Sequence, residues 1–589
     1  GRVTDTVQLG TYSGADFDCD GLSAPARSDL ALRTTTVYNT DGTVDTVTDP
    51  RALVTKYLYD ALGRRTKEVK NYDSGVNSGN PYSTDQNVTV AYGYTNGLRT
   101  SLTAVMENTA NNQVTTYIHG TTAGTPSAMK ISTGHLVRGV KYPDSTNGGT
   151  TSANIDSDSS DVVSYAYNAQ GQETYRKDQA GTVLETVFDT SGRRTSVVVS
   201  AVGSGVDTAV RRNETGYDSL GRTTSVVQFN ATSGGSATDG VAWTFDDWGN
   251  LASYAEDRDS AVSGGGNQYT TSYVWEKATA GRYTLRLSTM TLPDSRVITY
   301  TYRSLGGLHD DEASRVSGVV DGVTVAQYDY LGVGTVVRTK LYDIGCMSRV
   351  YNDSTPPAYV DLDLFNRITT SRWTKDLGTD RDFYQEALTY DRDSNITSAV
   401  DGVHGAYHSA GAGWDRKYSM DNVNRLTQAE EGTLSGGSIT SKTRDEQWTL
   451  SHTGNWDREK LDLNGDGDFV DTNELDDTRT HNAVNELLAR DADSNSSNNY
   501  TLAFDAAGNM TDDGKDYEYV YDAWNRLRKV NRTDNQALVA EYRYNALNHR
   551  IGVHEDTDVD GDVDANDKWY FDAFDERWRP LARYRESDT

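Results

Sequence analysis

One short unit recurs along this chain: an aromatic residue, then Asp or Asn, two variable residues, Gly or Asn, and often Arg. Complete copies begin at Tyr59, Phe188 and Tyr217. Variant copies begin at Tyr167, Phe245, Phe504, Tyr521 and Tyr544. A unit that returns at spacings of about 20–30 residues indicates a repeated structural element rather than a catalytic motif.

The fifth residue of the unit predicts its backbone conformation. Gly63 occupies this position in one copy, and Asn525 and Asn548 replace it in others. Gly and Asn are the residues that tolerate positive φ, so their exchange predicts a left-handed turn residue. The preceding Asp or Asn would bond the turn backbone, and Arg would begin the outgoing strand. Each copy therefore predicts one β-hairpin.

Strand patterns dominate between the copies. Residues 34–49 alternate apolar and polar side chains around Asp41-Gly42, which is a strong hairpin signal. Tyr517, Tyr519 and Tyr521 follow a period of two and share one face of a strand. The sequence predicts an all-β protein built from antiparallel hairpins.

Helical patterns are rare, and the best candidate covers residues 481–491. Asn482 would cap this helix, and Val484, Leu487 and Leu488 would share one face. The same residues also suit a strand, so the sequence leaves both interpretations open.

The composition favours an ordered protein with much wetted surface. The 589 residues exceed the roughly 250–300 residues that a single core serves. Only 35% of the residues are hydrophobic, and the mean hydropathy is -0.68. The 37 Tyr and 10 Trp residues argue against disorder, because disordered chains are poor in aromatic residues.

The formal net charge is -30, which disfavours nucleic acid and anionic membranes as partners and attracts cations. Solubility or adaptation to salt would equally explain this charge. No apolar run approaches 18 residues, so no membrane-spanning helix is expected. The chain begins at Gly1 without Met, which we interpret as a piece of a longer precursor. Cys19 and Cys346 allow at most one disulfide.

The repeated unit resembles the YD-repeat, or Rhs-repeat, family. The segments 49–69 and 178–197 look like full copies of its repeat, and the resemblance covers about residues 35–550. That family includes bacterial Rhs proteins, shell components of insecticidal toxin complexes, and teneurins. The resemblance implies a long sheet that spirals into a hollow shell, which in bacterial members encloses a toxic C-terminal domain.

This resemblance sets the expected organisation. Residues 1–34 would be an N-terminal segment continuing a longer precursor, and residues 35–589 would form the repeat shell. Loop insertions are expected at about 456–480 and 556–567, and the C-terminal end of the shell would be missing. No composition shift marks a domain boundary.

Residues 556–567 match the twelve-residue calcium loop, in which alternate oxygen ligands wrap a hard cation. The candidate ligands at positions 1, 3, 5, 7, 9 and 12 are Asp556, Asp558, Asp560, Asp562, Asp564 and Asp567. Gly561 occupies the sharp turn. An acidic, solvated loop without a metal is the alternative.

Residues 462–474 form another candidate Ca²⁺ loop, with a one-residue misfit. The candidate ligands are Asp462, Asn464, Asp466, Asp468 and Glu474. Glu474 falls one residue after the position that the template requires. No helix pair flanks either loop, so both would be insertions in hairpin loops.

No catalytic motif is found, and we expect no enzyme. Arg64, Arg193 and Arg222 repeat with the unit, which indicates structural ion pairs. Many bacterial Rhs proteins release their toxin near a segment with Asp-Pro, but the only Asp-Pro here is Asp49-Pro50 in an early repeat. Such a segment would lie beyond Thr589 in a longer precursor, or the protein lacks it.

The leading interpretation is a container or extracellular scaffold, secreted or at the cell surface, around a cargo domain of a longer precursor. A surface module that binds protein or glycan is the alternative. An acid-based hydrolase is the remote one, since 86 Asp and Glu residues always place some pair close together.

Overall fold

The computed structural model describes residues 2–9, 24–74, 84–143, 155, 162–263, 268–278, 284–302, 308–332, 334–342, 347–350, 361–375, 381–403, 413–492, 499–557, 561–564 and 566–586. Cys19 and Cys346 lie outside these residues. Nearly all the regular secondary structure of the described chain is β-strand, so the predicted all-β class of antiparallel hairpins is confirmed. Its helices within these ranges are α1 (Leu308–Glu312) and a 3-10 turn at Thr109–Asn111.

The chain divides into two units, and the first comprises residues 1–114 and 325–499. Its strands are β1 (Asp5–Leu9), β2 (Ala31–Tyr38), β3 (Val44–Thr48), β4 (Val54–Tyr59), β5 (Arg65–Lys70), β6 (Val88–Thr95), β7 (Leu98–Val105), β22 (Val323–Leu331), β23 (Thr335–Leu341), β24 (Met347–Val350), β25 (Thr370–Lys375), β26 (Arg381–Tyr390), β27 (Ile396–Asp401), β28 (Asp415–Met420), β29 (Leu426–Ser435), β30 (Ser438–Leu450), β31 (Trp456–Asp462), β32 (Leu475–His481) and β33 (Leu487–Asp491). Within β1–β7 and within β22–β33, each strand pairs antiparallel with the next along the chain.

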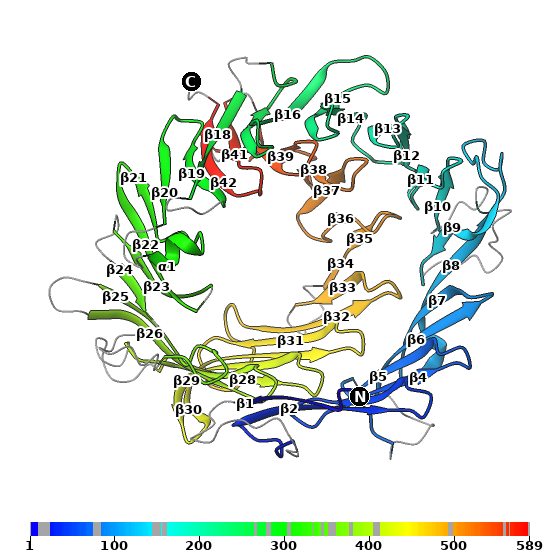
Figure 1. The fold of residues 1–589 in the computed structure, drawn as a ribbon. Coiled ribbons are helices and arrows are strands. Elements are labelled where there is room, and N and C mark those ends of the chain that lie inside the picture. Colours follow the sequence, from blue (N-terminus) through cyan, green and yellow to red (C-terminus); the bar gives the residue numbers. More distant parts are fainter. Residues whose placement is uncertain are drawn as a thin grey trace. The chain divides into compact units, whose positions relative to one another are not determined.

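The second unit comprises residues 115–324 and 500–589. Its first group of strands is β8 (Gln113–Thr121), β9 (Thr133–Lys141), β10 (Val162–Tyr167), β11 (Glu173–Lys177), β12 (Val183–Phe188), β13 (Arg194–Ala201), β14 (Arg212–Tyr217), β15 (Thr223–Phe229), β16 (Ala237–Phe245), β17 (Leu251–Asp257), β18 (Gln268–Lys277), β19 (Leu285–Thr291), β20 (Val297–Thr301) and β21 (Gly318–Asp321). Its C-terminal sheet is β35 (Ala503–Phe504), β36 (Met510–Asp512), β37 (Tyr517–Tyr521), β38 (Leu527–Arg532), β39 (Leu538–Tyr544), β40 (Arg550–Glu555), β41 (Trp569–Phe574) and β42 (Pro580–Arg585), and β34 (Asn499–Thr501) lies at the boundary. Figure 1 shows consecutive strands of this unit as neighbouring arrows.

The repeated unit forms the turn that its residues predict. In the copy at Phe188, the amide of Asp189 donates to Arg193 O at 2.9 Å, and the amide of Gly192 donates to Asp189 O at 3.0 Å. Gly192 has a φ of +78°, and the register shifts at Phe188. A type I turn followed by a left-handed residue and a bulge is a common three-residue hairpin connection. The predicted left-handed conformation is confirmed at Gly63, Asn525 and Asn548, whose φ values are +75°, +58° and +66°.

The Asp side chain holds this turn closed. Asp189 Oδ1 accepts the amides of Ser191 and Arg193 at 2.9 Å each, and Asp189 Oδ2 accepts Arg193 Nε at 2.7 Å. The amide of Arg193 and its guanidinium lower the pKa of the Asp189 carboxyl. The predicted structural ion pair of the repeat is therefore confirmed here and at Asp60–Arg64 and Asp218–Arg222.

Several turns are also bonded to the next one along the chain. The guanidinium of Arg193 lies over the ring of Tyr217 in the following copy, and the Tyr217 hydroxyl donates to Arg194 O at 2.8 Å. The same arrangement recurs at two other turns. Arg64 lies over the ring of Tyr94, whose hydroxyl donates to Arg65 O. Arg367 lies over the ring of Tyr390, whose hydroxyl donates to Ile368 O. Arg–aromatic contacts and hydrogen bonds therefore form a ladder along the turns of each unit.

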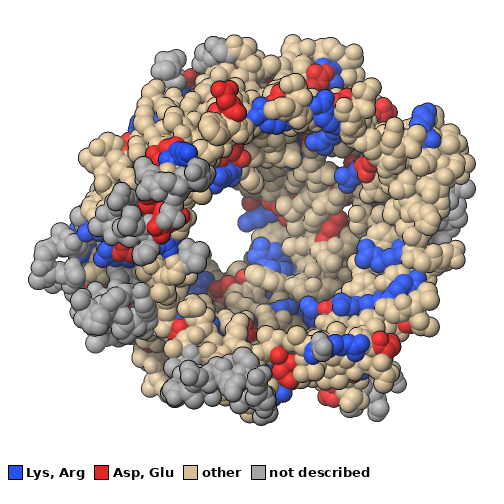
Figure 2. Space-filling model, in the orientation of Figure 1, with Lys and Arg blue, Asp and Glu red and all other residues tan. Residues whose placement is uncertain are grey.

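The apolar core is small. In the second unit, a cluster of buried residues spans the neighbouring strands β16, β17, β18 and β19. Its members are Val241, Tyr254, Tyr273, Met290 and Leu292, the last of which directly follows β19. Charged side chains are visible in several separate groups on the face drawn in Figure 2, with acidic and basic residues side by side.

The helix considered for residues 481–491 is wrong. β32 ends at His481, the turn of a further repeat copy follows, and β33 begins at Leu487. Asn482 Oδ1 accepts the amides of Val484 and Glu486, as Asp189 does in its own turn. Asn485 has a φ of +69° and takes the left-handed position.

Candidate functional sites

The first candidate calcium loop, residues 462–474, joins β31 to β32 in the first unit. Its framework is built by the first and last acids of the loop. Asp462 is fully buried, and its carboxylate accepts the amides of Asn464, Gly465 and Gly467. Glu474 accepts the amide of Leu463 at 3.0 Å and the amide of Asp471 at 3.1 Å.

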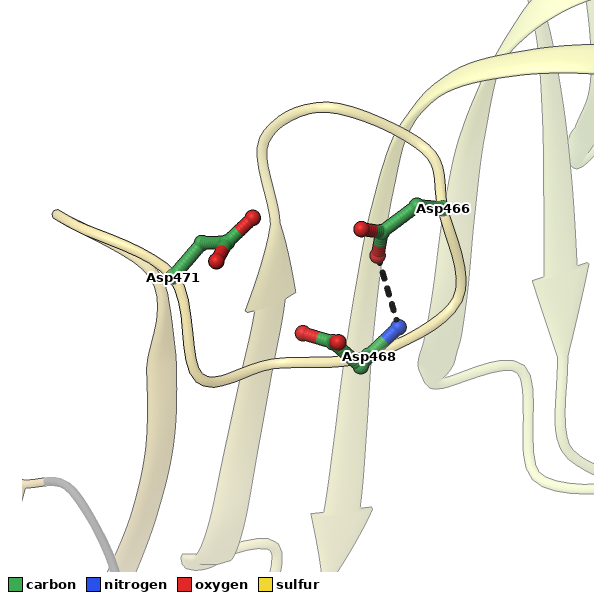
Figure 3. A group of neighbouring side chains, drawn as sticks. All are labelled: Asp466, Asp468 and Asp471. Carbon is green, nitrogen blue, oxygen red and sulfur yellow. Dashed lines mark hydrogen bonds between the residues drawn. The ribbon is translucent and has the colours of Figure 1, made fainter.

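Three exposed carboxylates of this loop converge. Ligand oxygens of Asp466, Asp468 and Asp471 lie within 4.8 Å of one another, and Figure 3 shows the three side chains pointing toward one another inside the curve of the loop. The Asp468 amide donates to Asp466 Oδ1 at 3.0 Å, and Asn464 Nδ2 donates to Asp471 Oδ2 at 2.7 Å. Hard carboxylate oxygens at such spacing suit Ca²⁺. Asp471 was missed by the sequence template, although its acidic type was the available signal.

The second candidate calcium loop, residues 556–567, joins β40 to β41 in the second unit. Asp556 Oδ2 accepts the amide of Gly561 at 2.9 Å, and Gly561 has a φ of +110°. Asp567 is buried and accepts the amides of Thr557 at 2.6 Å and Asp564 at 2.9 Å. Asp562 and Asp564 are exposed. Two further predicted ligands, Asp558 and Asp560, lie outside the described residues.

The two loops share one framework despite their different lengths. Asp462 and Asp556 each accept the amide of the glycine five residues later, Gly467 or Gly561. Glu474 and Asp567 each accept the amide of the second loop residue and that of a residue three positions before themselves. The first loop thus accommodates one extra residue before Glu474. The Glu474 side chain, which is longer than that of Asp567, accepts the amides at the equivalent positions.

Two buried carboxylates bind the C-terminal sheet of the second unit to β16 and β17. Glu256 Oε1 accepts Asn545 Nδ2 at 2.9 Å, and Glu256 Oε2 accepts the amide of Phe574 at 3.0 Å. Asp239 Oδ1 accepts the amide of Ala546 at 3.2 Å. Burial raises the pKa of both carboxyls to about 7. No local sequence pattern indicates this contact, because its partners lie about 300 residues apart.

No helix in the described part of the chain is long and apolar enough to cross a membrane.

Comparison with known proteins gives a likeness of fold. No protein-family model and no curated protein matches the sequence. The chain is similar to the crystal structures of TcdB2-TccC3 (TM-score 0.55, 13% identity) and TcdB2-TccC3-TEV (0.54, 13%). It is also similar to the structure of the Photorhabdus luminescens Tc holotoxin pore with the mutation TccC3-D651A (0.54, 13%).

These matches cover 95% of this chain but only 28–29% of the chains they match. At 13% identity the likeness shows the fold alone, so membership of the YD-repeat family stays a prediction. The chain nevertheless has the fold of a segment of toxin-complex chains, the class of protein that its repeated turns resemble.

Proposed function

We propose that this chain is a structural wall of a secreted or cell-surface protein and that the wall encloses a polypeptide cargo. Its role would be mechanical rather than catalytic. The observation that carries this proposal is the ladder of bonded turns, exemplified by Arg193 and Tyr217. The likeness to toxin-complex chains supports the same function at the level of fold.

A ladder of this kind lets a sheet grow without a solid core. The hairpin that begins at Phe188 is closed by its own Asp189 and is bonded to the following hairpin through Arg193 and Tyr217. The stabilising contacts run along the sheet rather than through a thick apolar interior. The low hydrophobic fraction of 35% agrees with a wall that is wetted on both faces.

Protection of a fused reporter tests the container. A small protease-sensitive domain would be joined after Thr589, and the same domain would be joined before Gly1 as the matched control. A container predicts that the C-terminal reporter resists a protease that removes the N-terminal one. Equal cleavage rates for the two reporters would contradict enclosure.

We further propose that both acidic loops bind Ca²⁺, which would stiffen long hairpin connections. Asp466, Asp468 and Asp471 would supply carboxylate ligands in the first loop. Asp562 and Asp564 would do so in the second, together with the predicted ligands Asp558 and Asp560. The framework shared by the loops supports one cation chemistry for both.

Exposed apolar side chains favour a second candidate function, binding to a protein or glycan surface. Leu220 and Trp248 are each 77% exposed and occupy the same position of successive turns. Arg222 lies over the ring of Phe245 and so connects these two turns. A Leu220→Ala/Trp248→Ala variant should lose binding to cells under this alternative. A wild-type chain that does not bind cells would leave only the container.

A further inference from the structure

A cavity of about 350 Å³ lies within the second unit, between the ends of β16 and β17 and the strands β38, β39 and β40. Its lining includes the charged residues Asp239, Arg258, Asp259, Arg528, Glu541 and Arg543. Cavities of a few hundred cubic ångströms with convergent polar groups are typical ligand sites.

Two of the three arginines have partners of their own. Arg528 is buried, with one side-chain nitrogen 3.5 Å from Glu541 and another 3.7 Å from Asp207. Arg258 Nη1 donates to the Tyr269 hydroxyl at 3.0 Å. Both guanidinium groups therefore already have bonded partners.

Arg543 is different. Its guanidinium lies 4.0 Å from the ring centroid of Trp569, but it makes no hydrogen bond or ion pair with any residue that the structure describes. Burial lowers the pKa of this guanidinium. The charges of Glu541, Asp259 and Glu586 oppose this effect, and the charge of Arg528 adds to it. A half-buried cation that lacks a bonded anion is costly, in a chain that carries 86 acidic residues.

Tyr544 adds a neutral hydrogen-bond donor to the same cavity. Burial raises the pKa of its hydroxyl above the usual range, so the proton stays on the oxygen at neutral pH. Arg543 and Tyr544 are neighbours on β39, and both line the cavity. A planar guanidinium fork matches the oxygens of phosphate and can bond two of them at once.

We propose that this cavity binds a phosphate group, as the free ion or as a phosphomonoester, with the Arg543 guanidinium as its principal ligand. The aromatic ring of Trp569 covers one face of the guanidinium, and no described residue bonds its N–H groups. Adventitious phosphate binding is disfavoured by the net charge of -30, so saturable binding would be diagnostic.

The test is calorimetric titration of the whole chain with inorganic phosphate and, separately, with ribose 5-phosphate, at pH 7 and low ionic strength. We expect saturable binding with a Kd of about 0.1–1 mM. Arg543→Gln should weaken it about tenfold or more, because charge-assisted hydrogen bonds are lost. Tighter binding of the ester would identify a phosphomonoester as the ligand, and tighter binding of phosphate would identify the free ion.

The matched control is Arg550→Gln. Arg550 also lies near an aromatic ring, 5.5 Å from the centroid of Tyr542, but it is exposed and does not line the cavity. This variant should bind phosphate as the wild type does. Wild-type chain that binds neither probe at about 10 mM would overturn the proposal even if Arg543→Gln fails to fold. A folded Arg543→Gln variant with unchanged affinity would overturn it too.

Discussion

The guanidinium of Arg193 lies 4.6 Å from the ring centroid of Tyr217, which belongs to the next hairpin turn along the chain. Arg193 is also held by Asp189 of its own turn. One side chain thus closes its own hairpin and contacts the following one, and this double role links local turn chemistry to the growth of the sheet.

The hydrogen bond of Tyr217 can be removed without removing its ring. Tyr217→Phe should lower the free energy of unfolding by about 0.5–1.5 kcal/mol, because the bond to Arg194 O is lost. Tyr217→Ala should cost more, since the ring contact with Arg193 goes as well. Urea unfolding of the two variants measures both steps. Equal stabilities of Tyr217→Phe and Tyr217→Ala would show that the ring contributes nothing.

The left-handed turn position can be tested at Gly63. A Cβ atom placed there would meet no atom within 4 Å, so a substitution reports backbone strain alone. Gly63→Ala should destabilise the chain by about 1–2 kcal/mol, because the φ of +75° is unfavourable for alanine. Gly63→Asn should cost clearly less, as Asn525 and Asn548 adopt this conformation in sister turns. The order of the two melting temperatures decides the matter.

Glu256 and Asp239 should make stability depend on pH near neutrality. The pKa of each is raised to about 7 in the fold, whereas free carboxyls titrate near 4. The folded chain therefore binds protons more tightly than the unfolded chain between about pH 4 and pH 7. The contribution of these carboxyls is fully present below pH 4 and is lost as the pH rises through 7.

Denaturant unfolding at several pH values tests this linkage. Glu256→Gln cannot titrate, so it should flatten the decline between about pH 5 and pH 8, whatever its effect on absolute stability. A decline as steep as that of the wild type would assign the pH dependence to other groups.

Calcium should raise the melting temperature of EDTA-treated chain, and calorimetry should count about two ions per chain. A variant with Asn at Asp466, Asp468 and Asp471 should bind about one ion, because only the second loop remains. Asp534→Asn, at an exposed acid of an unrelated turn, is the control and should bind as the wild type does. An unchanged melting temperature with EDTA at low salt would reject calcium at both loops.

The sequence predicts the turns whose copies keep the aromatic residue that begins the unit. The turn at Asn482 departs from this pattern because His481 stands at the aromatic position and Glu486 at the Arg position. Asn482 Nδ2 donates to Glu486 Oε2 there, whereas Asp189 accepts from Arg193. The spacing of Val484, Leu487 and Leu488 also imitates a helical face. A rule based on hydrogen-bond pairs rather than residue names would have found it.

The sequence predicted the candidate sites less completely than it predicted the turns. Asp471 was missed because the template assumes twelve residues and the loop has one more. The cavity around Arg543 is formed by segments that are far apart in the chain, such as Arg258 and Arg528. No local pattern encodes such a meeting, because it depends on how the C-terminal sheet packs against β16 and β17.

The side-chain bond that closes a turn joins residues four positions apart, such as Asp189 and Arg193. The residues that determine the turn therefore lie within the hairpin itself. Gain or loss of a whole hairpin would leave the remaining junctions chemically unchanged. Duplication of part of the gene could therefore change the length of such a protein by whole repeats. Insertions should be tolerated best at the junction between two repeats.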